Sequence, residues 1–224
     1  TSQFQTVVLE SFDDPAESWW IARGSRFTTE GFPQYGYIET WPNALYRTAP
    51  EGVELRSFGV QGAFDRQGYN YIEFIPVEAE DDEDGNPVPR GIPVQGQAQS
   101  IDLWAWGSNL DYYLELHVRD YEGIVHVLPL GDLNYLGWRN LRTPVPNAIP
   151  QRSTVPPNVR SLEVVKIVMW TNPGEVVSGF YLYLDEMKAF TDVFQDPFDG
   201  ESLAVPEVVD SLWDNAQGTP EGGN

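Results

Sequence analysis

Apolar and polar residues alternate along most of this chain, in short runs that Gly, Pro, Asn and Asp separate. The alternation is clearest between residues 100 and 142, for example in Leu103-Trp104-Ala105-Trp106 and in Tyr112–Arg119. A period of two residues with many aromatic and β-branched side chains is typical of strands that have one buried and one exposed face. We therefore predict four consecutive antiparallel strands in this segment.

The same pattern predicts strands on both sides of this segment. These strands cover residues 4–10, 35–39, 53–60, 69–77, 161–171 and 179–190. The run Phe180-Tyr-Leu-Tyr-Leu184 is nearly apolar throughout, which is typical of a central strand covered on both faces. No long helical periodicity interrupts the strands. Closely spaced strands of this kind predict an all-β fold, namely a jelly-roll β-sandwich with long loops.

Two loops and an acidic tail complete the predicted organisation. Residues 78–99 contain an acidic run, and residues 143–158 contain five prolines, which a central strand does not tolerate. Residues 191–224 have no Lys or Arg, and within them Val205–Trp213 has the pattern of a short amphipathic turn or helix that lies on a partner. We predict a single sandwich domain over residues 1–190, followed by an acidic C-terminal tail over residues 191–224.

The hairpin at residues 111–130 has a predicted register. If Arg119 pairs with Ile124, the apolar residues of both strands share one face, as burial requires. His117 then faces His126 on the opposite face, close to Glu115 and Arg119. Such a pair of imidazoles can hold a metal ion with Glu115 or titrate together near pH 6. Because no third or fourth ligand is evident, an ordinary polar face is the simpler interpretation.

Composition and charge limit the classes of partner. The formal net charge of -21 predicts that the chain repels nucleic acid and anionic lipid, and no apolar run is long enough to insert into a membrane. The chain has no Cys, so neither disulfides nor thiolate chemistry contribute. It begins at Thr1 rather than Met, from which we expect an exported protein whose signal peptide has been cleaved.

Catalytic motifs are not evident, and we predict that the protein is not an enzyme. His117 and His126 are the only histidines, and the chain contains no nucleophile elbow, phosphate-binding loop or zinc-protease motif. A pair of carboxylates for glycoside hydrolysis remains an alternative, because acidic side chains are plentiful. We expect no cofactor other than a structural Ca²⁺, for which Glu10, Asp13 and Asp185 are the candidate ligands if the fold brings them together.

Aromatic side chains form the candidate binding surface. Trp104 and Trp106 lie on one face of the same predicted strand together with Asp102, and they can stack on sugar rings or on a protein partner. The candidate binding residues are Trp104, Trp106, Tyr113, His117, Arg119 and His126. The wider aromatic set also includes Trp138 and Trp170. For most of this set we expect burial in a large core rather than a role in binding.

A family resemblance follows from the order of these motifs. The run Ser100-Ile-Asp-Leu-Trp-Ala-Trp-Gly-Ser-Asn109 precedes a Tyr-rich hairpin and then Gly137-Trp-Arg-Asn-Leu-Arg142. The closing strands contain Trp170 and Gly179-Phe-Tyr-Leu-Tyr-Leu-Asp185. Together these motifs resemble the spirochaete flagellar filament outer-layer (sheath) protein family, FlaA-like, over residues 100–190. The Gly-Trp-Arg strand and the closing strand also resemble carbohydrate-binding jelly rolls.

The resemblance implies an exported structural protein of the periplasm. Members of that family coat the flagellin core of periplasmic flagellar filaments beside other sheath or coiling proteins, and they influence filament stiffness and curvature. The expected partners of this chain are therefore the flagellin core, other sheath or coiling proteins and, along the filament, further copies of the chain. The short acidic tail departs from the long charged helical tail of some members, so contacts made through that tail do not carry over. A non-catalytic glycan-binding module is the alternative function.

Overall fold

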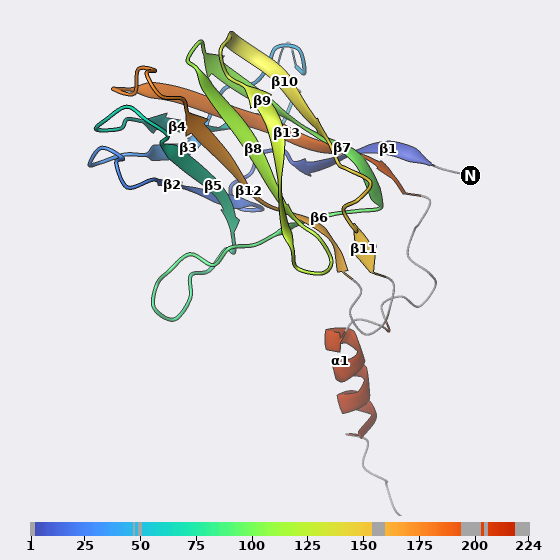
Figure 1. The fold of residues 1–224 in the computed structure, drawn as a ribbon. Helices are drawn as coiled ribbons and strands as arrows, with labels where there is room; N and C mark the ends of the chain where they lie inside the picture. The colour runs from blue at the N-terminus through green and yellow to red at the C-terminus, as the bar shows by residue number, and fades with distance from the viewer. Residues whose placement is uncertain are drawn as a thin grey trace, which may run out of the picture.

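The computed structural model describes residues 3–46, 48, 51–153, 160–193, 203 and 206–217. Two antiparallel sheets face one another (Figure 1). Sheet A consists of β1 (Phe4–Glu10), β3 (Gln34–Ile38), β4 (Ser57–Gly62), β7 (Gln97–Ser108), β10 (Leu136–Pro144) and β13 (Phe180–Asp192). Sheet B consists of β2 (Trp19–Gly24), β5 (Tyr71–Val77), β6 (Ile92–Val94), β8 (Tyr112–Arg119), β9 (Val125–Asp132), β11 (Arg152–Ser153) and β12 (Arg160–Thr171). The described part of the tail contains one helix, α1 (Pro206–Gln217).

Strands distant in sequence lie side by side in both sheets. Sheet A has the order β10-β7-β13-β4-β3, with β1 paired to β13. Sheet B has the order β2-β5-β12-β8-β9, with β6 and β11 paired to β12. The predicted all-β sandwich is therefore confirmed, and each of the strands predicted from alternation has a counterpart. The short strands β6 and β11 lie within segments that we predicted as loops, because each is too short to show a period of two residues.

The core fills the space between the two sheets. Its largest fully buried side chains come from both sheets and from the segment after β1, and they are Phe12, Trp20, Phe58, Ile72, Phe74, Ile101, Leu103, Leu114, Leu116, Leu162, Ile167 and Met169. Each such side chain contributes about 1.5–3 kcal/mol through the removal of apolar surface from water. Every second residue of β8 belongs to this core, as do Ile101, Leu103 and Ala105 of β7, so the residues between them lie on the outer faces of the sandwich.

Strand β13 is central in sheet A, but the prediction that both of its faces are covered is wrong. Leu182 and Leu184 point into the core, whereas Tyr181 is 49% exposed. The Tyr residues between the Leu residues belong to the outer face, and a Tyr ring can lie at a water-facing surface with its hydroxyl solvated. The outer face of sheet A therefore carries aromatic side chains in the middle of the sheet.

The predicted register of the β8–β9 hairpin is wrong by one residue. Arg119 pairs with Val125, so that His126 faces Val118 rather than His117. A shift of one residue moves every side chain of a strand to the other face. Leu128 and Leu130 consequently enter the core, while Val125 and Val127 are exposed on the outer face. The two histidines do not form a pair.

The carboxylate of Asp120 explains this register. Asp120 Oδ1 accepts hydrogen bonds from the backbone N–H groups of Glu122 and Ile124, at 2.9 Å and 3.0 Å, and Oδ2 lies 2.7 Å from His126 Nε2. Burial acts to raise the pKa of Asp120, but the hydrogen bonds from His126 and the two amides outweigh it and lower the pKa below its ordinary value. The Asp120 side chain thus holds Ile124 in the turn, and strand pairing begins with Val125 opposite Arg119.

Replacing this carboxylate should destabilise the domain. We expect Asp120→Ala to lower the free energy of unfolding by about 1–3 kcal/mol, because two part-buried backbone amides and His126 lose their hydrogen-bond partner. The matched control is Glu122→Ala, which removes an exposed carboxylate from the same turn and should change stability by less than about 0.5 kcal/mol. Urea unfolding followed by circular dichroism measures both. Equal effects of the two substitutions would contradict the role of Asp120.

Candidate functional site

A row of aromatic side chains crosses the outer face of sheet A. Trp138 on β10 pairs with Trp106 on β7, and Trp106 pairs with Tyr183 on β13. The ring centroids of Trp106 and Tyr183 are 5.4 Å apart, and those of Trp138 and Tyr183 are 6.4 Å apart. Residues that pair directly across neighbouring strands point to the same face, so the three rings form one continuous surface.

The row continues over two glycines. Tyr183 pairs with Gly59 on β4, and Gly59 pairs with Gly36 on β3. A Cβ atom at Gly59 would lie 2.8 Å from the Ile38 side chain and 3.1 Å from the Tyr183 ring, so only glycine leaves these neighbours in place. The absence of side chains at the two glycines leaves a hollow of about 240 Å³ beside Tyr181 and Tyr183. We call the row Trp138, Trp106, Tyr183, Gly59 and Gly36 the aromatic groove.

The hollow at the glycine end of the groove has an uncharged lining. The polar side chains that share this outer face are the amides of Gln34 and Gln61 and the phenols of Tyr181 and Tyr183. Neighbouring strands lie about 4.8 Å apart, so a row that crosses five strands is about 19 Å long. Aromatic faces beside amide and hydroxyl groups suit a neutral, elongated ligand with apolar faces and polar edges.

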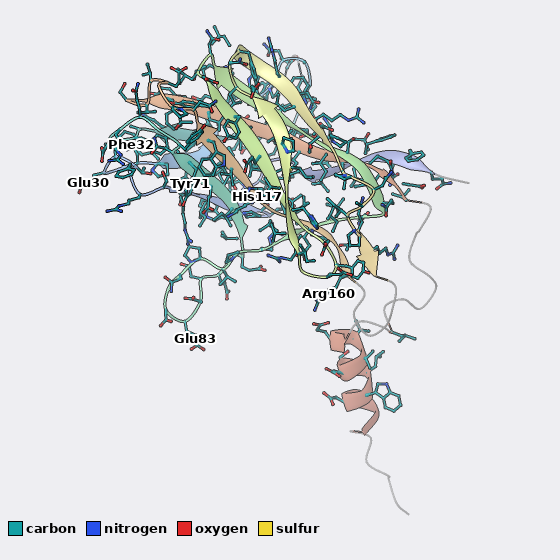
Figure 2. All side chains as sticks on the ribbon, in the orientation of Figure 1. Glu30, Phe32, Tyr71, Glu83, His117 and Arg160 are labelled. Atoms are coloured by element: carbon teal, nitrogen blue, oxygen red, sulfur yellow. The ribbon has the colours of Figure 1, made fainter. Side chains whose placement is uncertain are left out.

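The predicted binding residues do not form one site. Trp104 and Trp106 lie on the outer face of sheet A, whereas Tyr113, His117 and Arg119 lie on the outer face of sheet B. His117 Nε2 lies 3.1 Å from Glu115 Oε2, and Arg119 Nη1 lies 3.2 Å from Glu163 Oε2. His126 is held by Asp120 in the hairpin turn. Figure 2 shows His117 on β8 within sheet B.

The expectation that most of the aromatic set fills the core is wrong. Trp104, Trp106, Tyr113, Trp138 and Trp170 are all half-buried and point outwards. The physical reason is the alternation itself, which assigns the core face of each strand to the Leu, Ile, Val and Ala residues between the rings. Sequence analysis missed Tyr183, Gly59 and Gly36 as parts of a site. The alternation of Tyr with Leu in β13 is a signal for Tyr183, whereas the glycines become recognisable only through the strand order.

Carboxyl groups gather next to the groove, beside the β13 bulge. Asp185 pairs with Trp104 and is buried, and Asp185 Oδ2 lies 3.3 Å from Ser57 Oγ. Burial raises the pKa of Asp185 to about 8, and the negative charges of Asp13 and Glu186 add to this effect. The hydroxyl of Ser57 donates its single proton to the Thr40 carbonyl, at 2.6 Å. Because Ser57 Oγ has one proton and its shorter contact is with the Thr40 carbonyl, the raised pKa of Asp185 favours a protonated carboxyl group beside Ser57.

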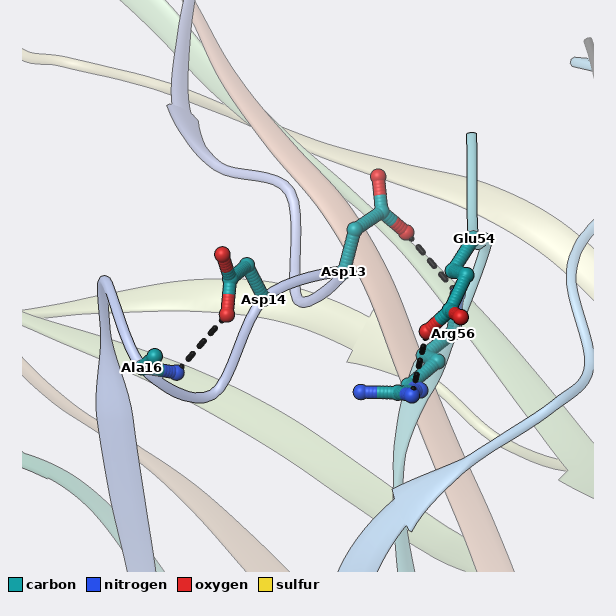
Figure 3. Close-up of polar contacts among 5 residues, drawn as sticks. All are labelled: Asp13, Asp14, Ala16, Glu54 and Arg56. Atoms are coloured by element: carbon teal, nitrogen blue, oxygen red, sulfur yellow. Dashed lines mark hydrogen bonds and ion pairs between the residues drawn. The ribbon is translucent and has the colours of Figure 1, made fainter. Parts of the chain in front are cut away.

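The candidate calcium ligands each have other partners. Asp13 Oδ1 accepts a hydrogen bond from the backbone N–H of Arg56 at 2.9 Å (Figure 3). Burial raises the pKa of Asp13 and of Glu10, and a side-chain hydrogen bond from Ser18 acts against the rise at Glu10. Within the described residues, no group of three or more His, Cys, Asp or Glu side chains is arranged to hold a metal ion. The calcium site stays a prediction.

The Asp185 pKa predicts a pH dependence of stability. An ordinary Asp in the unfolded chain loses its proton near pH 4, whereas folded Asp185 keeps its proton up to about pH 8. The contribution of this group to stability is complete below pH 4 and decreases as the pH rises towards 8. We expect Asp185→Asn to remove that part of the pH dependence, because the amide can still donate to Ser57. Thermal unfolding between pH 5 and pH 8 measures it, and an unchanged pH dependence in Asp185→Asn would contradict the assignment.

Comparisons with known proteins agree on one family. The model of the family described as flagellar filament outer layer protein Flaa matches residues 8–196. A putative flagellar filament outer layer-like protein of Brachyspira hyodysenteriae is 21% identical over 198 residues, which cover 78% of this chain and 86% of that protein. None of the helices in the described ranges has the length and apolar character that crossing a membrane requires.

Several similar solved structures are β-sandwich carbohydrate-binding modules. A family 61 module in complex with β-1,4-galactotriose has a TM-score of 0.43 at 12% identity, covering 81% of this chain and 94% of that one. A family 11 module from a cellulosomal cellulase of Clostridium thermocellum has a TM-score of 0.45 at 9% identity, covering 84% of this chain and 95% of that one.

Proposed function

The chain belongs to the flagellar filament outer layer protein family, and on this premise we propose that it is a structural subunit of the sheath that coats the flagellin core of periplasmic flagellar filaments. The observation that carries the proposal is the extent of the family match. Residues 8–196 include all of the sandwich except the first residues of β1. The whole domain, rather than one motif within it, is therefore of the outer-layer type, and this supports a role in assembly.

The family indicates an extracellular or periplasmic flagellar location. Our proposal places the protein in the periplasm, after export and cleavage of a signal peptide. The role is non-catalytic: the subunit packs against the core, against other sheath or coiling proteins and against its own copies, and thereby influences filament stiffness and curvature. Many modest contacts suffice for such an assembly, because each is repeated along the filament and the repeats act together.

Two features of the structure support an assembly role. Helix α1 presents exposed apolar side chains, among them Leu212 and Trp213, and Figure 1 shows it standing apart from both sheets. The aromatic groove is a second surface whose rings are accessible to a partner. Residues of these kinds, Trp and Tyr above all, make the largest contributions to binding when a partner buries them.

Removal of the tail tests the proposed function. We expect deletion of residues 194–224 to leave the melting temperature of the sandwich nearly unchanged, because β13 ends at Asp192 and its pairing remains complete. Incorporation into filaments, measured by quantifying the chain in purified filaments, should fall several-fold. Filaments that contain the truncated chain at the level of the full-length chain would contradict the role of the tail in assembly.

A second candidate function, glycan binding, is favoured by the aromatic groove. Sugar rings present apolar faces that stack on Trp and Tyr, and hydroxyl groups that pair with amides and phenols. The length of the row accommodates several sugar units of an uncharged chain. The ligand would be a neutral oligosaccharide, on the filament or in the cell wall, and no reaction follows from its binding.

A matched pair of substitutions tests the second candidate. We expect Trp106→Ala and Tyr183→Ala each to weaken binding of a neutral β-linked oligosaccharide about tenfold, which corresponds to about 1.4 kcal/mol. The control is Trp170→Ala on the outer face of sheet B, which leaves the groove intact. Isothermal titration calorimetry with galactotriose and cellotetraose measures the dissociation constants. No detectable binding by the unaltered protein, or an equal loss in the control, would exclude a glycan site in the groove.

A further inference from the structure

Helix α1 separates apolar and acidic side chains onto two faces. Val208, Val209, Leu212 and Trp213 follow the spacing i, i+1, i+4, i+5, which places them along one side of a helix. Glu207, Asp210 and Asp214 lie on the opposite side. Leu212 is 50% exposed and Trp213 is 65% exposed, although their side of the helix is the apolar one.

This helix needs a partner surface. A helix of this length is only marginally stable in water, and most helical stability in proteins comes from packing of the apolar face. All ionisable side chains after Lys188 are carboxylates, so the partner surface should combine exposed apolar side chains with free cations.

The β8–β9 hairpin offers a surface of that kind. Ile124, Val125 and Val127 are between 46% and 53% exposed, and Val125 lies directly opposite Arg119. Next to the turn, a hollow of about 380 Å³ is lined by Arg119 and Arg160 together with Asp120, Gly123, Ser161 and Glu163. We call Ile124, Val125, Val127, Arg119 and Arg160 the hairpin patch. Figure 2 shows Arg160 at the end of the sandwich, where β12 begins.

The charges of the hairpin patch favour an acidic helix. Arg119 forms an ion pair with Glu163 at 3.2 Å, whereas Arg160 forms no ion pair within the described residues. Asp120 is engaged by His126 and by two backbone amides, so it has little capacity for another cation. Glu122 in the turn is exposed, and its negative charge would repel a carboxylate of the docked helix. The acidic side of a docked helix must therefore point towards Arg160 and away from Glu122.

We propose that α1 of one copy docks on the hairpin patch of a second copy. This inference rests on the proposed function, because the partner of the tail is taken to be the neighbouring subunit in the sheath. Val208, Val209, Leu212 and Trp213 cover Ile124, Val125 and Val127, and the helix carboxylates face Arg160. We assign the partner to a second copy because Leu212 and Trp213 of α1 and the apolar side chains of the hairpin patch are all exposed within the single chain, so neither surface covers the other there.

The connection to α1 is long enough for this contact. Residues 194–205 join the end of β13 to the helix, and a chain of this length spans at most about 40 Å. The helix and the hairpin patch are different surfaces, so each copy can give its helix to one neighbour and accept the helix of another. A contact between two different surfaces produces a closed ring only if the rotation between neighbouring subunits divides a full turn. With any other rotation it produces an open chain of subunits.

Two complementary variants test the inference on the full chain. The helix variant carries Leu212→Asp and Trp213→Asp, and the patch variant carries Val125→Asp and Arg160→Glu. Sedimentation velocity should show concentration-dependent growth of the unaltered protein beyond a dimer, and only monomers for each variant alone. An equimolar mixture should form dimers and nothing larger, because the patch variant donates its helix to the intact patch of the helix variant. Val176→Asp, which alters an exposed valine outside the patch, should associate as the unaltered protein does.

Several results would overturn the inference. A monomeric unaltered protein at all concentrations would exclude docking between copies, and so would a mixture of the two variants that stays monomeric. Growth of the patch variant beyond a monomer would assign the helix to another surface, such as the aromatic groove. Filaments that contain the patch variant at the normal level would also exclude the hairpin patch as the contact, yet they would leave the proposed sheath function intact. Absence of the unaltered chain from filaments would instead contradict the sheath function itself.

Discussion

Burial of one face of each sheet is the constraint on which the rest of this structure depends. Leu, Ile, Val and Ala occupy alternate positions along β7, β8, β12 and β13, and their side chains meet between the two sheets. Successive side chains of a strand point to opposite faces of the sheet, so the remaining positions must lie on the outer faces. The Trp and Tyr residues of β7, β10 and β13 therefore lie outside, although aromatic residues of this size usually contribute to a core.

Local alternation in the sequence predicted most of the fold, because burial of one face repeats every second residue and needs no knowledge of partners. It did not predict the β8–β9 register, which depends on a single polar group. The Asp120 side chain accepts hydrogen bonds from the backbone N–H groups of Glu122 and Ile124 and so includes Ile124 in the turn. Apolar burial alone does not select the register, because one register buries Val125 and Val127 and the observed one buries Leu128 and Leu130. The hydrogen bonds of Asp120 therefore select between two registers that bury similar apolar side chains, since a backbone amide that loses its acceptor destabilises the fold.

The aromatic groove was only partly predictable for a different reason. Trp106 and Trp138 stand out in the sequence, but Gly59 and Gly36 gain their meaning only when β13, β4 and β3 lie in that order. The order of strands in a sheet is set by contacts between distant segments, which alternation does not encode. Asp185 shows the same limit: its residue type marks it as a candidate metal ligand, but its burial beside Ser57, which raises its pKa to about 8, follows from the packing of distant strands. The family match then supplies what geometry alone does not, namely the assembly in which these surfaces act.

The subunit combines a β-sandwich, an aromatic surface on the outer face of sheet A and an amphipathic helix on an acidic tail. A reconstruction of the intact flagellar filament by electron cryomicroscopy shows whether this chain is a subunit of the sheath. A sheath subunit should give density for this β-sandwich in the layer outside the flagellin core, repeated along the filament and in contact with neighbouring subunits. A complete outer layer in which no density fits the sandwich would contradict this role.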